Sequence, residues 1–135
     1  MTKNSVYISQ TNCITPLGFD VASNFEAVLA GKSAIKLSEN YPMFDAVPLG
    51  ESSNDEINHR FTEISPSQDY SRLEKLLILA LYPIIKEKKI TDKSILILST
   101  TKGNITLLQN KEKIVLTVYL GKLAKKVADF SGFKT

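Results

Sequence analysis

The chain has 135 residues, a net charge of +3, 43% hydrophobic residues and 23% charged residues. These values are typical of one soluble globular domain and exclude a disordered chain. No run approaches the ~18 apolar residues of a membrane span, and no secretory signal opens the sequence. The dense basic face of a nucleic-acid module is also missing. We therefore expect a single cytoplasmic domain over residues 1–135 that binds neither nucleic acid nor membrane.

The only cysteine is Cys13 and the only histidine is His59. One cysteine cannot form an internal disulfide. With one cysteine and one histidine, a zinc site whose ligands all come from this chain is not expected. Cys13 has no cationic neighbour or helix start to activate its thiol, so we interpret it as a small apolar residue rather than a nucleophile. We interpret His59 as a surface residue. No metal or cofactor is expected.

The first predicted elements are a strand and a helix. Residues 5–9 are rich in β-branched and aromatic side chains and predict a strand. The sequence Thr-Pro-Leu-Gly at 15–18 ends it, because proline lacks an amide donor and Gly18 permits a sharp turn. A helix should follow over 21–30, with Asp20 as its N-cap and Gly31 just after its end. Its apolar stripe comprises Val21, Phe25, Val28 and Leu29.

Residues 32–69 form the least regular third of the chain, which predicts a functional loop or several short elements. Residues 57–61 read as a short helix or strand. A long helix should follow over 71–89, opened by a capping box of Ser71 and Glu74. Pro83 predicts a kink near residues 79–82. The broad apolar face of this helix comprises Leu73, Leu76, Leu77, Ala80, Leu81, Ile84 and Ile85.

Residues 94–99 contain four apolar residues in a row, which predicts a strand covered on both faces. Gly103 and Asn104 suit a turn with positive φ. A second helix is expected over 111–130, ended by residues 131–133, whereas 105–108 remain unassigned. Helix, buried strand and helix together indicate an α/β fold. Open α/β sheets bind ligands at the carboxyl ends of strands, so the candidate pocket-lining residues are Ser99, Thr100, Thr101 and Gly103.

Lysines are concentrated in the last third of the sequence. They fit two interpretations: solvated helix faces with cations near helix C-termini, or a docking surface for an acidic partner. The cluster comprises Lys86, Lys88, Lys89, Lys93, Lys102, Lys111, Lys113, Lys122, Lys125 and Lys126.

Several motifs resemble the N-terminus of the β-ketoacyl synthases, the condensing enzymes of fatty-acid and polyketide synthesis. The strand at 6–8, the turn at 14–18, and Phe25 followed by Leu-Ala-Gly-Lys-Ser at 29–33 carry the first match. The start of the long helix at 71–76 and the segment 95–103 carry a looser one. The resemblance covers most of the chain, is weakest at 39–68 and is closer to the elongating type of synthase.

This resemblance implies a partial thiolase-like fold, the N-terminal portion of a mixed sheet with packed helices. The complete enzyme would be an acyltransferase that uses one cysteine and two histidines and takes its substrate from acyl carrier protein. Cys13 and His59 match none of these three residues, so no catalytic residue is assigned. We expect an inactive fragment whose sequence stops at Thr135, about where the strand leading to the catalytic cysteine should begin.

Two further expectations remain. The chain could instead be a small binding module that docks an acidic partner, such as acyl carrier protein, through its lysines. A part of a domain should also leave apolar faces and sheet edges uncovered, which predicts a homodimer or other self-association.

Overall fold

A computed structural model describes residues 5–41, 43–109 and 118–134. These residues form a small α/β fold with four α-helices and a two-stranded antiparallel sheet, so the predicted α/β class is confirmed. The elements in chain order are α1 (Val21–Leu29), β1 (Ile35–Ser38), β2 (Val47–Gly50), α2 (Asn54–Thr62), α3 (Arg72–Glu87), the 3-10 helix η1 (Ile105–Gln109) and α4 (Leu120–Ser131).

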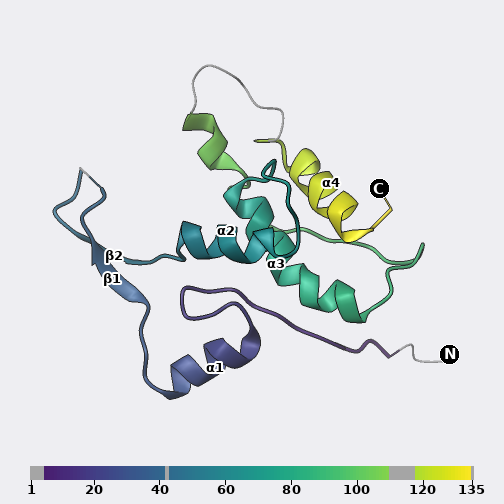
Figure 1. The fold of residues 1–135 in the computed structure, drawn as a ribbon, viewed down its shortest axis with the longest axis horizontal. Helices are drawn as coiled ribbons and strands as arrows, with labels where there is room; N and C mark the ends of the chain where they lie inside the picture. Colours follow the sequence, from purple (N-terminus) through teal and green to yellow (C-terminus); the bar gives the residue numbers. More distant parts are fainter. Residues whose placement is uncertain (1–4, 42, 110–117, 135) are drawn as a thin grey trace.

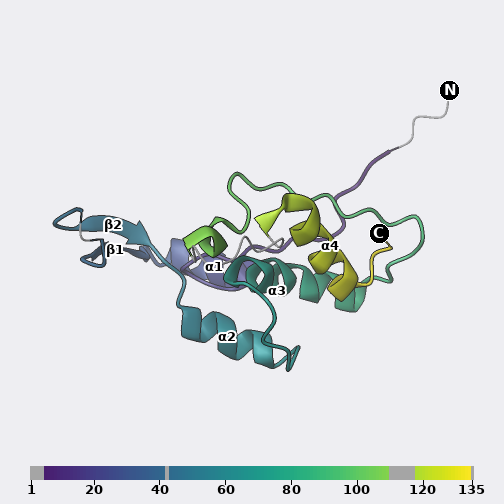
Figure 2. The ribbon, with the colours of Figure 1, turned by 90° about the horizontal axis from the view of Figure 1, so that it is seen from above.

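The core lies where α3 packs between α2 and α4 (Figures 1 and 2). Phe61 of α2, Ile78 of α3, and Leu123 and Val127 of α4 are completely buried there. Aromatic rings close one side of the core: the Phe61 ring lies 5.1 Å from that of Tyr70 and 6.1 Å from that of Phe130. These three helices therefore bury one shared apolar centre.

A buried polar network joins the start of α3 to two distant parts of the chain. Glu74 Oε2 accepts hydrogen bonds from Ser71 N at 2.7 Å and from Lys126 Nζ at 3.0 Å, and its Oε1 accepts from Asn104 Nδ2 at 3.0 Å. Ser71 Oγ donates to Asn104 Oδ1 at 2.7 Å and accepts from Glu74 N at 3.2 Å. The predicted capping box is thus confirmed, and these donors satisfy a carboxylate that is only 1% exposed.

The predicted helix near the N-terminus is confirmed as α1. Asp20 and Ser23 form a reciprocal capping box, and Gly31 adopts a φ of 66° just beyond the last turn. Its apolar stripe, however, faces solvent, and the buried residues of α1 are Asn24 and Ala27. This happens because nothing in the described part of the chain covers the stripe.

The apolar face predicted for α3 is only partly correct. Its completely buried apolar residue is Ile78, which lies outside the predicted set, while Leu73, Leu77 and Leu81 are half-buried against the core. The contact with α2 and α4 is centred on Ile78, so the wider apolar face extends past the edge of the core. The helix continues through Pro83, and the kink there stays a prediction.

The helix predicted over 111–130 corresponds in part to α4, and residues 111–117 lie outside the described residues. The predicted C-terminal stop is confirmed. Gly132 adopts a φ of 78°, and Phe133 N donates to Ala128 O at 3.0 Å, which closes the last turn.

Both predicted strands are wrong. Residues 5–9 and 94–99 are irregular because no described neighbour offers them ladder hydrogen bonds. Residues 94–99 also have one covered face rather than two: Leu96 and Leu98 contact the core, whereas Ile95 and Ile97 are exposed. The predicted mixed sheet is therefore absent from the described residues.

The sheet that does form comes from the irregular third. Ile35 pairs with Gly50 and Ser38 pairs with Val47, giving a hairpin that projects away from the helices (Figure 1). The same third contains α2, so the prediction of short elements within 32–69 is confirmed.

Candidate functional site

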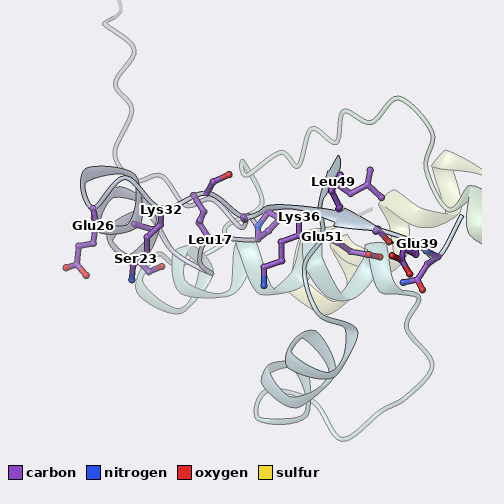
Figure 3. A pocket seen from close by; sticks show the side chains of 16 residues that line it. Leu17, Ser23, Glu26, Lys32, Lys36, Glu39, Leu49 and Glu51 are labelled. Atoms are coloured by element: carbon purple, nitrogen blue, oxygen red, sulfur yellow. Dashed lines mark hydrogen bonds between the residues drawn. The ribbon is translucent and has the colours of Figure 1, made fainter. Parts of the chain in front are cut away.

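A hollow of about 1120 Å³ lies between α1 and the hairpin (Figure 3). It is formed by the turn before α1, one side of α1, the exit from α1, and the two strands. Its lining comprises Pro16, Leu17, Ser23, Glu26, Ala27, Ala30, Lys32, Ser33, Ala34, Lys36, Leu37, Ser38, Glu39, Asn40, Leu49 and Glu51.

The turn at one wall of the hollow is fastened to α1 by Asn24. Thr15 and Gly18 exchange both backbone hydrogen bonds, at 2.9 and 3.1 Å. Asn24 Nδ2 donates to Gly18 O at 3.0 Å and Asp20 O at 2.7 Å, and its Oδ1 accepts from Thr15 Oγ1. Sequence reasoning missed Asn24. The available signal was an amide inside a helix, beside its apolar stripe and four residues before Val28, where such residues are seldom favoured without a backbone partner.

Gly18 is required for space rather than for a special backbone conformation. A Cβ atom at this position would lie 2.2 Å from Ser23 Oγ and 3.1 Å from Asn24 N, and the φ of Gly18 is not positive. The predicted turn is therefore confirmed, but the glycine is needed there because the start of α1 comes so close.

The hydroxyl groups around the hollow serve the backbone. Ser33 Oγ accepts from Ile35 N at 3.2 Å, and Ser38 Oγ accepts from Asn40 N at 3.4 Å. Ser23 Oγ donates to Asp20 O at 3.1 Å. The amide and hydroxyl of Ser23 hold the pKa of Asp20 below its ordinary value, because both hydrogen bonds favour the carboxylate.

Charged side chains of both signs surround the hollow (Figure 3). They comprise Glu26, Lys32, Lys36, Glu39 and Glu51. Among the described lining residues none is a histidine or cysteine, and the serines act in turns and caps. The described lining of the hollow therefore offers no nucleophile paired with a base.

The four predicted pocket-lining residues lie elsewhere, in the turn before η1. Thr100 Oγ1 accepts from Gly103 N at 3.1 Å, and Gly103 has the predicted positive φ, 57°. A Cβ atom on Gly103 would lie 2.6 Å from Leu120 Cδ2, so α4 packs closely on this turn. Ser99 and Thr101 are exposed. A pocket at these four residues stays a prediction.

The role of Asn104 differs from the expected one, which was a turn residue with positive φ. Its φ is not positive, and its side chain is buried against Ser71 and Glu74. The sequence suggested a turn-forming residue because asparagine tolerates left-handed backbone, but here its amide group joins the turn to α3.

Neither Cys13 nor His59 lines the hollow. Cys13 is partly buried, and its carbonyl oxygen accepts from Asn24 Nδ2 at 3.4 Å. His59 lies on the exposed side of α2, as predicted, with Nδ1 3.6 Å from Glu63 Oε1. Within the described ranges, no three histidine, cysteine or acidic residues are grouped to hold a metal ion. Likewise, no helix in those ranges has the length and apolar character to cross a bilayer.

Part of the lysine cluster is paired with acidic side chains of the same chain. Lys126 binds Glu74, and its Nζ lies 4.7 Å from the centre of the Tyr70 ring. Lys125 pairs with Asp129 at 2.9 Å. Lys102 and Lys122 are exposed, whereas residues 111 and 113 lie outside the described residues.

Comparison of the chain with known protein families gave no match, and neither did comparison with curated proteins or with solved structures.

Proposed function

We propose that the chain is the N-terminal part of a β-ketoacyl synthase of the elongating type. The observation that carries this proposal is how the two motifs of the resemblance meet. Pro16 and Leu17 from the turn, and Lys32 and Ser33 from the exit of α1, line the same hollow. Asn24 fastens that turn to the helix between the two motifs. The two motifs thus form one structural unit, as expected if the chain shares the architecture of these synthases.

The uncovered strand-like segments support the same proposal. Residues 5–9 and 94–99 have sequences that favour strands, yet neither has a ladder partner in the described part of the chain. In a thiolase-like fold both would belong to a five-stranded sheet. Further strands of a complete enzyme would supply the missing hydrogen bonds and cover Ile95 and Ile97.

In the complete enzyme this portion would contribute architecture rather than catalysis. An acyl chain would be loaded on a cysteine outside this sequence. Two histidines would then assist decarboxylation of a malonyl thioester on acyl carrier protein, and the carbanion would attack the acyl thioester. The product would be an elongated fatty-acid or polyketide chain made in the cytoplasm.

The decisive experiment is the intact mass of the protein produced from its native gene. We expect a longer protein that continues into a strand, a cysteine at a helix start and two later histidines. That protein should form an acyl-enzyme with a radiolabelled acyl thioester, and the 135-residue chain should not. A native protein of only these 135 residues would overturn the proposal.

A second candidate is a binding module for an acidic protein such as acyl carrier protein. Exposed Lys102 and Lys122 favour it, because they flank the close contact between Gly103 and Leu120. Binding should weaken steeply with salt and with the double substitution Lys102→Glu and Lys122→Glu, while Lys36→Glu on the hairpin serves as the control. Binding that is absent or insensitive to salt would remove this candidate.

A further inference from the structure

The two outer edges of the hairpin differ in their backbone donors. Among the described residues the sheet has two strands, so β1 and β2 each have one edge without a neighbouring strand. In an antiparallel pair, opposite residues alternate between exchanging both hydrogen bonds and exchanging none. Leu37 lies opposite Pro48, and proline has no N–H, so this pair exchanges none. The N–H and C=O of Leu37 therefore point to the outer edge of β1.

The hydrogen bond of Ile35 agrees with this alternation. Ile35 lies opposite Gly50, two residues from the Leu37 pair, so its N–H also points outward. That N–H donates to Ser33 Oγ at 3.2 Å rather than to the ladder. On β2, the residue that faces outward opposite Leu37 is Pro48, which offers no donor. The outer edge of β1 is therefore the one that can pair with a further strand.

The hollow lies along this outer edge. Successive residues of a strand point to opposite faces, yet Lys36, Leu37 and Ser38 all line the hollow, as expected where a hollow follows the edge of a strand. The opposite wall belongs to α1, where small side chains leave room for another backbone: Ser23, Ala27 and Ala30.

We propose that the outer edge of β1 binds an extended peptide of a partner protein, which adds to the hairpin as a third, antiparallel strand. One peptide residue lies opposite Leu37 and exchanges both backbone hydrogen bonds with it. In this mode of recognition, the backbone bonds supply affinity and the side chains beside them supply specificity. The inference rests on the free edge of the hairpin and is independent of the proposed function.

The side chains along β1 define the chemistry of the peptide. Lys36 and Glu39 line the hollow (Figure 3), and within the described ranges neither forms an ion pair. An acidic residue opposite Lys36 and a basic residue opposite Glu39 would stabilise the pairing. Ile35 is 65% exposed and Leu37 is 73% exposed, so apolar β-branched residues suit the positions opposite them. With threonine opposite Ser38, the antiparallel partner of residues 35–39 reads Lys-Thr-Val-Glu-Val.

The first test is an NMR titration of the isotope-labelled 135-residue chain with the blocked peptide acetyl-Lys-Thr-Val-Glu-Val-amide. We expect the largest amide shifts at residues 34–40 of the chain. A methyl group on the nitrogen of the central valine removes the N–H that donates to Leu37 O, so it should raise the dissociation constant at least about threefold. Exchanging the lysine and the glutamate of the peptide keeps its composition and should also weaken binding.

The second test changes the edge itself. Leu37→Pro removes the outward N–H and should abolish binding, whereas Leu37→Val keeps both the N–H and an apolar side chain and should preserve binding. Circular dichroism and the amide spectrum should show that both variants remain folded.

The third test reverses one charge without altering the backbone. Lys36→Glu should weaken binding about two- to fivefold, and a peptide with lysine in place of its glutamate should restore the affinity. Lys86→Glu, at an exposed position of α3 outside the hollow, is the matched control and should leave binding unchanged.

Three results would overturn the proposal. They are the absence of peptide-induced shifts at residues 34–40, equal binding by the N-methylated peptide, and a loss in Lys36→Glu that the complementary peptide does not reverse. Each readout concerns the hairpin of the 135-residue chain, so its failure is distinct from a failure of the proposed function, which the native length tests.

Discussion

The two halves of the molecule contain similar helices in different surroundings. In the α2–α3–α4 unit, Phe61 is completely buried among two aromatic rings. In α1, Phe25 is 62% exposed, although it belongs to an equally regular apolar stripe. Both regions have well-formed helix caps. The difference shows that an amphipathic pattern specifies which face needs a cover, while the cover itself must come from elsewhere.

The largest effect should come from truncating the two phenylalanines. Phe61→Ala should lower the free energy of unfolding by about 3–5 kcal/mol, because it removes a ring from a packed core. Phe25→Ala should change it by about 0.5 kcal/mol or less. Urea unfolding followed by circular dichroism measures both. Equal losses would show that α1 is covered in solution.

The polar network should be the next most sensitive feature. Glu74→Ala should cost about 2–3 kcal/mol, because it leaves Asn104 and Lys126 without their buried acceptor. The control is Glu56→Gln on α2, which breaks the exposed pair with Arg60 and should cost about 0.5 kcal/mol or less. The same unfolding measurement applies, and a smaller loss for Glu74→Ala than for Glu56→Gln would contradict the network's role.

Two glycine substitutions should have opposite signs. Gly18→Ala should destabilise the fold by about 1–2 kcal/mol, because its Cβ would collide with Ser23 at the start of α1. Gly121→Ala in α4 meets no atom within 4 Å and should stabilise by up to about 1 kcal/mol, since alanine favours helix. Thermal unfolding of the two variants compares them directly. Stabilisation by Gly18→Ala would show that the turn and α1 are not packed together.

The smallest effect concerns pH and the cap of α1. The pKa of Asp20 is lowered in the folded chain by the hydrogen bonds from Ser23, so its stabilisation is fully present above its ordinary pKa of 3.8. That stabilisation is lost as the pH falls through the lowered folded pKa. The Ser23 amide signal in NMR should follow this titration. Asp20→Ser, which keeps a cap without a carboxylate, should abolish the titration of that signal. A signal that still titrates in the variant would mean that another group is responsible.

Local signals in the sequence predicted local structure well. The caps at Asp20 and Ser71, and the positive φ of Gly31 and Gly103, depend on a few neighbouring residues, and the structure confirms them. The long helix α3 was found for the same reason, because its period and its cap coincide over 16 residues.

Features that depend on distant partners were predicted less well. Residues 5–9 and 94–99 have strand-forming side chains, but a strand exists only with a neighbour. Asn24 was not singled out, and Asn104 was expected only as a turn residue with positive φ. Their roles appear only when a turn is brought beside a helix. The hollow between α1 and the hairpin could not be predicted, because the hairpin itself was not recognised in the irregular third.

The Glu74 network also bears on the order in which this chain folds. Its partners Asn104 and Lys126 are 30 and 52 residues away from it, so the network is complete only after two long loops have closed. The cap at Ser71 and the turns of α3 need no such closure. Helix α3 is therefore expected to form early in folding. The hydrogen bonds of the network, which join α4 to α3, are expected to form late. Amide hydrogen exchange should then reveal one cooperative unit of α2, α3 and α4, whereas α1 and the hairpin exchange separately and faster.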